Sequence, residues 1–256
     1  VHLTLNANVA IAPGLGLSAG VGKNLYHNFQ KIKLTSDSVL PHVRSDIKHY
    51  LQQGEDNLTR LTASYFFMPF EDIYFRVSAG YFEEMYGGFS TEVLYRPFDS
   101  RFAFGFDINR VRKREFAQRL GFLDYRVTTG HANLYYHFPF YNLLTEVNIG
   151  QYLAEDRGVT YNISRLFDTG VRVGMWATFT DVSAEQFGEG SFDKGIFLSI
   201  PFHVFLPIST TAHGNFGFRP LTRDGGQRVA VRGRLYDVSN NATLGAVVHK
   251  WGALLD

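Results

Sequence analysis

The chain contains 256 residues, of which 16% are aromatic, and 25 Lys and Arg against 24 Asp and Glu give a net charge of +1. Nucleic-acid binding normally needs a basic surface, so this balance argues against a nucleic-acid partner. The absence of cysteine excludes disulfides, thiolate metal sites and a cysteine nucleophile.

The chain opens with two segments in which apolar side chains alternate with polar or small ones. In residues 3–11, Leu, Ala, Val and Ile occupy every second position, with Thr, Asn and Ala between them. In residues 15–22, Gly and Ser separate the apolar residues. Because side chains alternate across a strand, both segments are predicted to be strands with one apolar face. Pro13 and Gly14 predict a tight turn between them.

Residues 38–53 depart from this alternation. Val43, Ile47 and Leu51 recur at helical spacing, and Ser38 is a suitable N-cap. We therefore predict a short amphipathic helix over 38–53, inside a long connection at about 27–56.

Four further segments alternate in the same way: residues 73–81, 101–109, 143–150 and 171–179. The clearest is 101–109, in which one face carries Phe102, Phe104, Phe106 and Ile108. Its other face carries Arg101, Ala103, Gly105, Asp107 and Asn109. A soluble sandwich buries its apolar face, whereas a barrel in lipid turns that face outward and lines its lumen with small, polar and charged residues. The small or polar second face favours the barrel.

The connections between these segments alternate in length. Short turns are expected near 13–14, 69–72, 97–100, 139–142 and 168–170, and longer connections near 27–56, 83–88, 110–126, 154–158 and 181–194. Outer-membrane barrels have short periplasmic turns and longer external loops. The prediction is an all-β fold: a transmembrane antiparallel β-barrel of about 12 strands, each roughly 9–11 residues long. A soluble β-sandwich or a lipocalin-like barrel is the alternative.

The C-terminal part combines an arginine-rich segment with a predicted helical tail. Arg219, Arg223 and Arg228 lie around Gly225 and Gly226, and Arg232 and Arg234 then alternate with Val231 and Leu235. This arginine-rich face is expected to point inward and to pair with lumen carboxylates such as Glu92, Asp107 and Glu146, as charges at membrane depth require. The barrel is assigned to residues 1–236. A tail at 237–256, with Leu244, Val247, Val248 and Trp251, is expected to be helical and to lie in the interface or plug the barrel mouth.

Two groups of residues are candidates for binding polysaccharide or lipopolysaccharide. Arg110, Arg112 and Arg114 alternate onto one face at a predicted external strand end, where they suit phosphate or acidic-sugar groups unless they belong to a solvated loop. Aromatic rings on predicted lumen faces can stack on sugars or pack the lumen. These are Tyr74, Tyr135, Tyr152 and Trp176.

No set of residues frames a catalytic or metal site. Glu185, Glu189 and other loop acids have no spacing that defines a glycosidase pair. The acidic, glycine-containing segment 180–195 does not match an EF-hand calcium loop. No G-x-S-x-G elbow occurs. We therefore expect no catalytic residue, no metal and no cofactor.

Several long motifs are similar to one known family. They include Leu-Pro-His-Val-Arg-Ser-Asp at 40–46, Glu-Glu-Met-Tyr-Gly-Gly at 83–88, Val-Leu-Tyr-Arg-Pro at 93–97 and Arg-Pro-Leu-Thr-Arg-Asp-Gly-Gly-Gln at 219–227. Together they resemble the C-terminal part of the YjbH/GfcD family of bacterial outer-membrane exopolysaccharide and capsule proteins. Full-length members are longer and resemble lipoproteins at their N-terminus. With no visible signal peptide, this chain is expected to be a piece of a longer precursor.

The resemblance implies a location in the bacterial outer membrane and a role in exopolysaccharide export or assembly. We expect a non-enzymatic barrel component. Its partners would be membrane lipid, lipopolysaccharide, exopolysaccharide and proteins of a secretion system. An outer-membrane enzyme acting on polysaccharide or lipid A, and a general porin, are the alternatives.

Overall fold

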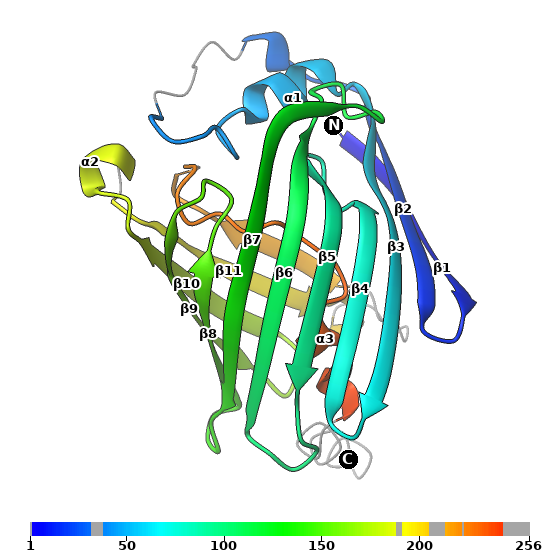
Figure 1. Cartoon of the computed structure of the whole chain (residues 1–256), viewed down its shortest axis with the longest axis vertical. Helices are drawn as coiled ribbons and strands as arrows, with labels where there is room; N and C mark the ends of the chain where they lie inside the picture. The colour runs from blue at the N-terminus through cyan, green and yellow to red at the C-terminus, as the bar shows by residue number, and fades with distance from the viewer. Residues whose placement is uncertain (1, 32–37, 188–190, 205–212, 222, 243–256) are drawn as a thin grey trace.

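A computed structural model describes residues 2–31, 38–187, 191–204, 213–221 and 223–242. Within these ranges, twelve strands form one antiparallel sheet in which each strand pairs with the next one in sequence (Figure 1). The strands are β1 (His2–Ala12), β2 (Leu15–Asn24), β3 (Asp56–Phe70), β4 (Ile73–Tyr81), β5 (Tyr86–Tyr95), β6 (Phe102–Arg114), β7 (Phe122–His137), β8 (Leu143–Gln151), β9 (Arg157–Leu166), β10 (Arg172–Thr180), β11 (Asp193–Pro201) and β12 (His213–Phe218). The predicted all-β, antiparallel architecture of about 12 strands is confirmed.

The helical segments of the described ranges are all short. They are η1 (Phe29–Lys31), α1 (Ile47–Gln53), α2 (Ala184–Phe187), η2 (Phe202–Val204), α3 (Leu235–Val238) and η3 (Ser239–Ala242). None of the described helices has the length and apolar character needed to cross a membrane.

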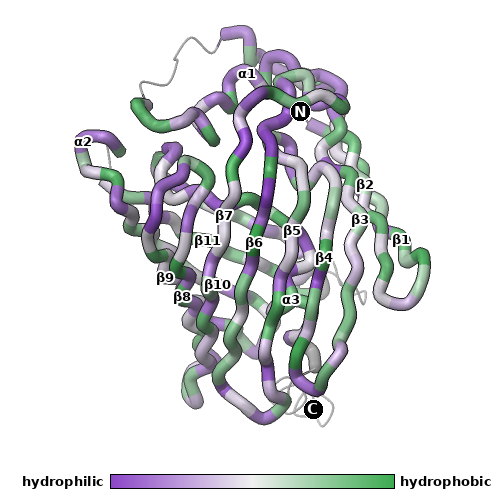
Figure 2. Tube along the Cα trace, viewed as in Figure 1, coloured by the Kyte–Doolittle hydropathy of each residue, from purple (hydrophilic) through white to green (hydrophobic). Residues whose placement is uncertain are grey.

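The two faces of the sheet differ as the alternation predicts. In β6, Phe102, Phe104, Phe106 and Ile108 point outward and are 43–53% exposed. Asp107 and Asn109 lie on the concave face and are buried. Figure 2 shows green apolar and purple polar positions alternating along the strands. The polar face is therefore the covered one, which is the reverse of a soluble sheet.

The sheet curves around a segment from its own C-terminal part. Residues 223–240 run along the concave face, and the orange and red trace in Figure 1 lies inside the curve of the strands. Contacts with strands on either side of the segment hold it there. Gly233 approaches Phe66 of β3, the backbone N–H of Leu235 donates to Glu92 of β5, and Gly226 approaches Thr178 of β10. Two apolar clusters, one around Val43 and Tyr86 and one around Leu94 and Tyr135, pack against this segment.

The connections fall at two ends of the sheet. Because neighbouring strands are antiparallel, the segments 25–55, 115–121 and 181–192 lie at one end, and 71–72, 96–101 and 138–142 at the other. The end that carries α1 is called the α1 end below. The connection predicted at 110–126 is shorter than expected, because β6 continues to Arg114 and β7 begins at Phe122.

The predicted helix over 38–53 was too long at its N-terminal side, since α1 covers only Ile47–Gln53. Two features exclude residues 40–46 from the helix. Leu40 precedes Pro41, which disfavours helical geometry there. The backbone N–H groups of Arg44 and Ser45 donate to one carboxylate oxygen of Asp224, at 2.7 and 2.9 Å.

The predicted boundary between residues 236 and 237 falls within α3. The sheet ends earlier, at Phe218, and residues 223–236 lie inside it instead of forming strand. Helical structure covers residues 235–242, whereas Leu244, Val247, Val248 and Trp251 lie outside the described residues.

Candidate functional site

The concave face of the sheet presents a row of three carboxylates and one amide from four neighbouring strands. Glu92 of β5, Asp107 of β6 and Glu146 of β8 point inward at alternating positions, and Asn133 of β7 lies between the last two. Each of the three carboxylates is buried, so each needs a charged or hydrogen-bonding partner.

Arginines supply those partners. Arg76 of β4 lies 2.9 Å from Glu92. Arg228 of the inner segment lies 3.0 Å from Asp107, and Arg234 forms an ion pair with Glu146. The predicted pairing of inner-segment arginines with Asp107 and Glu146 is confirmed. Glu92 instead pairs with a sheet arginine and accepts from the backbone of Leu235, at 3.0 Å.

A second set of contacts fixes the inner segment at the α1 end. Asp224 accepts from the backbone N–H groups of Arg44 and Ser45 and from the hydroxyl of Ser45. Asp46, which precedes α1, forms an ion pair with Lys113 of β6. Burial raises the pKa of Asp46, but the hydrogen bond and charge of Lys113 outweigh it and hold the pKa below its ordinary value. The loop before α1 is thus tied both to the inner segment and to the sheet.

Cavities remain on both sides of the inner segment. One of about 660 Å³ lies between residues 230–232 and β1, β3 and the α1 loop, and a neighbour of about 300 Å³ continues along β1–β3. On the opposite side, cavities of about 320 and 650 Å³ are lined by β9–β11 and β8–β12 residues respectively. Most of the charged lining side chains are arginines, which makes these spaces suited to acidic ligands.

The three candidate arginines on β6 do not share one face. Arg110 and Arg112 point outward, next to the exposed Arg126 of β7. A register shift between Arg112 and Arg114 turns Arg114 inward, where it is fully buried. Its guanidinium donates to the carbonyls of Glu83, Gln118 and Arg119 at 2.8–3.0 Å. The expectation that Arg114 faces the same ligands as the other two was wrong, because the β-bulge changes its side.

The four candidate aromatic residues all lie on the concave face, but in different surroundings. Tyr135 is stacked on Tyr236 with ring centroids 3.9 Å apart. Tyr152 is fully buried, and its hydroxyl is hydrogen-bonded to the hydroxyl of Thr160. Tyr74 packs against the cluster around Leu94. Trp176 lines the cavity of about 320 Å³, where its indole N–H donates to Asp193 at 3.0 Å. For Tyr74, Tyr135 and Tyr152 the surroundings favour the packing role over sugar stacking.

The acids and histidines do not assemble into a metal cluster among the residues that the structure describes. His131 lies 3.4 Å from Asp107, but both are buried and His131 is packed edge-on against Tyr152. Glu185 is exposed on α2, and Glu189 lies outside the described residues.

Sequence reasoning missed Arg60 of β3. The expectation that Arg232 pairs with a lumen carboxylate was wrong, because among the described residues Arg76, Arg228 and Arg234 pair with Glu92, Asp107 and Glu146. Arg60 is buried and lines the two cavities on the β1–β3 side, together with Arg232. The inward position of Arg60 could have been predicted from the sequence. Leu61, Ala63 and Tyr65 form the outward apolar face of β3, so Arg60 and Thr62 must point inward. The proximity of Arg232 depends on the path of the inner segment.

Comparison with known proteins identifies the family of this chain. The model of the YjbH family, described as "Exopolysaccharide biosynthesis protein YbjH", matches residues 1–241. An Escherichia coli (strain K12) protein named "Uncharacterized lipoprotein YjbH" is 41% identical over an alignment of 228 residues that covers 86% of this chain. The alignment covers 32% of that relative, so the chain spans about a third of its length. No solved structure matches the chain. The extent of the family match and the identity to this relative show that the chain belongs to the YjbH family of exopolysaccharide biosynthesis proteins.

Proposed function

We propose that the chain forms an outer-membrane β-barrel that supports the export or assembly of exopolysaccharide and catalyses no reaction itself. The observation that carries this proposal is the reversed distribution of side chains on the sheet. Apolar residues of β6 and its neighbours are exposed on the convex face, whereas arginines and carboxylates are buried on the concave face. Exposed apolar surface of this extent is rare on soluble monomers and is what a barrel presents to lipid.

The topology is compatible with a closed barrel. A series of twelve antiparallel strands leaves β1 and β12 running in opposite directions at the two edges of the sheet. Pairing of these edges would complete an antiparallel barrel without an exposed edge, as the membrane interior requires. β6 and β7 have 13 and 16 residues, long enough to span the hydrocarbon layer when tilted.

The outer-membrane location is proposed from the name of the relative and from the side chains at the α1 end. The relative from E. coli is named a lipoprotein, which supports a place in the bacterial envelope. The α1 end carries the longest connections and the outward Arg110, Arg112 and Arg126. In the outer membrane, such a cluster at the external side would bind the phosphate groups of lipopolysaccharide. The large α1-end loops also offer a surface for proteins of a secretion system.

The interior supports a role other than catalysis or general diffusion. Glu92, Asp107 and Glu146 are each engaged by an arginine, which leaves them poorly suited to act as an acid and base pair. The inner segment occupies the middle of the interior and leaves only narrower spaces beside it. A general porin would have a wider channel.

The proposal is tested in the native host by deleting the gene that encodes this chain and measuring exopolysaccharide at the cell surface and inside the envelope. Loss of surface polymer, with restoration by the wild-type gene, is the expected result. Unchanged surface polymer would contradict the proposed function. Turnover of exopolysaccharide or lipid A by the purified protein would instead favour an enzyme, and large nonselective conductance in planar bilayers would favour a porin.

A further inference from the structure

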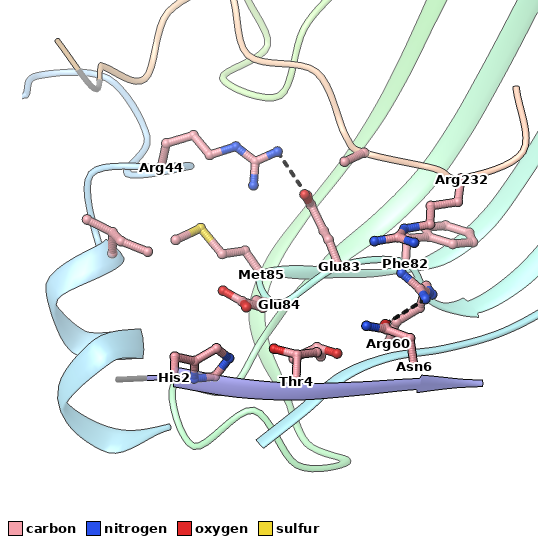
Figure 3. Close-up of a pocket in the computed structure, with 13 residues that line it drawn as sticks. His2, Thr4, Asn6, Arg44, Arg60, Phe82, Glu83, Glu84, Met85 and Arg232 are labelled. Atoms are coloured by element: carbon pink, nitrogen blue, oxygen red, sulfur yellow. Dashed lines mark hydrogen bonds and ion pairs between the residues drawn. The ribbon is translucent and has the colours of Figure 1, made fainter. Parts of the chain in front are cut away.

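Arg60 of β3 and Arg232 of the inner segment lie next to each other in the interior without a carboxylate partner. Figure 3 shows both guanidinium groups at the same side of the larger cavity, beside Phe82. Among the described residues, no acidic side chain lies within ion-pair distance of either one. The charge of Arg232 opposes that of Arg60, and the carboxylates that line the same cavity are Glu83, which pairs with Arg44, and Glu84.

This pair differs from other arginines in the interior. Arg76, Arg228 and Arg234 each have a carboxylate within ion-pair distance. Arg60 is 5% exposed and is held only by neutral groups: its Nε donates to Ser18 at 2.9 Å and Nη2 donates to Asn6 at 3.0 Å. Arg232 is exposed and lines the cavity, and its side chain makes no hydrogen bond or ion pair with another described residue. Two like charges held together in the interior are stabilised when an anion lies between them.

The space around the pair is suited to such an anion. Arg60 and Arg232 line both cavities on the β1–β3 side, so the two cavities meet at this pair. The walls next to it carry neutral hydrogen-bonding groups such as Thr4, Asn6 and Thr62. The hydroxyl of Thr59, which lines the larger cavity, is buried and has no hydrogen-bond partner. The two guanidinium groups can bind the carboxylate of an acidic sugar, and the neighbouring hydroxyl and amide groups can hydrogen-bond its hydroxyl groups.

We propose that Arg60 and Arg232 bind the carboxylate of an acidic sugar residue as the exopolysaccharide occupies the groove between the inner segment and β1–β3. This proposal rests on the proposed function and names the class of polymer, a uronic-acid-containing polysaccharide. A guanidinium donates two parallel hydrogen bonds to a carboxylate, which gives both affinity and orientation. A neutral polymer has no carboxylate, so it gains neither affinity nor orientation from this pair.

The test measures binding of oligogalacturonate to the purified full-length protein in detergent by calorimetry, with a malto-oligosaccharide of equal length as the neutral probe. Wild type is expected to bind only the acidic probe. Arg232→Gln should weaken that binding roughly tenfold or more, and Arg232→Lys less, since the charge remains. Arg172→Gln, which alters an arginine in the cavity on the opposite side, is the matched control and should bind as wild type does.

Arg60→Gln is a second variant, read only if its heat-modifiable gel mobility shows that it has folded. Equal binding of both probes, or equal losses in Arg232→Gln and Arg172→Gln, would overturn the proposal. So would binding of lipopolysaccharide through Arg232 without binding of oligogalacturonate. If acidic binding is absent while the deletion strain still loses surface polymer, only this inference fails. If the deletion strain keeps its surface polymer, the proposed function fails.

Discussion

Arg228 in the inner segment places Nη2 3.0 Å from Oδ2 of Asp107 in β6, although the two residues are 121 positions apart in the sequence. The same nitrogen lies 3.4 Å from the amide oxygen of Asn133. This contact joins the middle of the inner segment to the middle of the sheet. Asp107 is buried, and a buried charge needs a partner. Arg228 of the inner segment therefore stabilises the charge of Asp107.

We expect Arg228→Gln and Asp107→Asn each to lower the free energy of unfolding by about 1–3 kcal/mol, since each leaves a charged group in the interior with fewer partners. The double variant should lose less than the sum, because it removes both charges. Urea unfolding in detergent micelles measures these values. Arg110→Gln, on the outer face, is the control and should change stability by less than about 0.5 kcal/mol. Strict additivity would argue against a direct interaction.

Phe104→Asp should impair membrane insertion, because Phe104 is 53% exposed on the convex face that is proposed to meet lipid. Gly105→Ala, on the opposite face, should be tolerated: the nearest atoms to an added Cβ lie 3.4 Å away. Heat-modifiable mobility and membrane fractionation of both variants provide the measurement. Normal insertion of Phe104→Asp together with failure of Gly105→Ala would contradict the proposed faces.

Arg114 and Arg112 should behave differently despite their spacing. Arg114→Gln removes charged donors from three backbone carbonyls at the α1 end and should cost at least about 2 kcal/mol of stability. Arg112→Gln should leave stability within about 0.5 kcal/mol of wild type but reduce lipopolysaccharide binding. Unfolding midpoints and a lipopolysaccharide pull-down distinguish the two effects. Equal losses of stability in the two variants would mean that the three hydrogen bonds of Arg114 do not stabilise the protein.

The pair Asp46–Lys113 should contribute a pH-dependent part of the stability. Because the folded pKa of Asp46 is depressed, the pair stabilises the protein above the unfolded pKa near 3.8 and loses this contribution as pH falls below that value toward the folded pKa. Melting temperatures of wild type and Asp46→Asn should therefore differ at pH 6 and converge below about pH 3.8. A constant difference over this range would contradict the assignment.

The proposed orientation places the α1 end outside the cell. Because the chain has no cysteine, single cysteines can be read without background. Arg119→Cys and Glu185→Cys, at exposed positions of the α1 end, should react with an impermeant thiol reagent in whole cells. Ser100→Cys, exposed at the opposite end, should react only after the outer membrane is opened. Labelling of Ser100→Cys alone in intact cells would show the inverse orientation.

The strands and their two faces could be predicted from local alternation. In β6 the side chains from Phe102 to Arg112 point to the faces that their parity predicts. The reason is that a strand repeats every two residues, so the pattern needs no knowledge of distant contacts. The inward pairing of Arg228 and Arg234 followed from a second local argument, that buried charges need partners.

Only the tertiary structure decided where this local rule ends. A register shift between Arg112 and Arg114 moves Arg114 from the outer face to the interior, and pairing with β7 defines that shift. The length of α1 depends on Asp224, which takes the N–H groups that a longer helix would have used. The meeting of Arg60 and Arg232 depends on the path of residues 223–240 inside the sheet. These features arise from contacts between residues far apart in sequence, which a period of two does not encode.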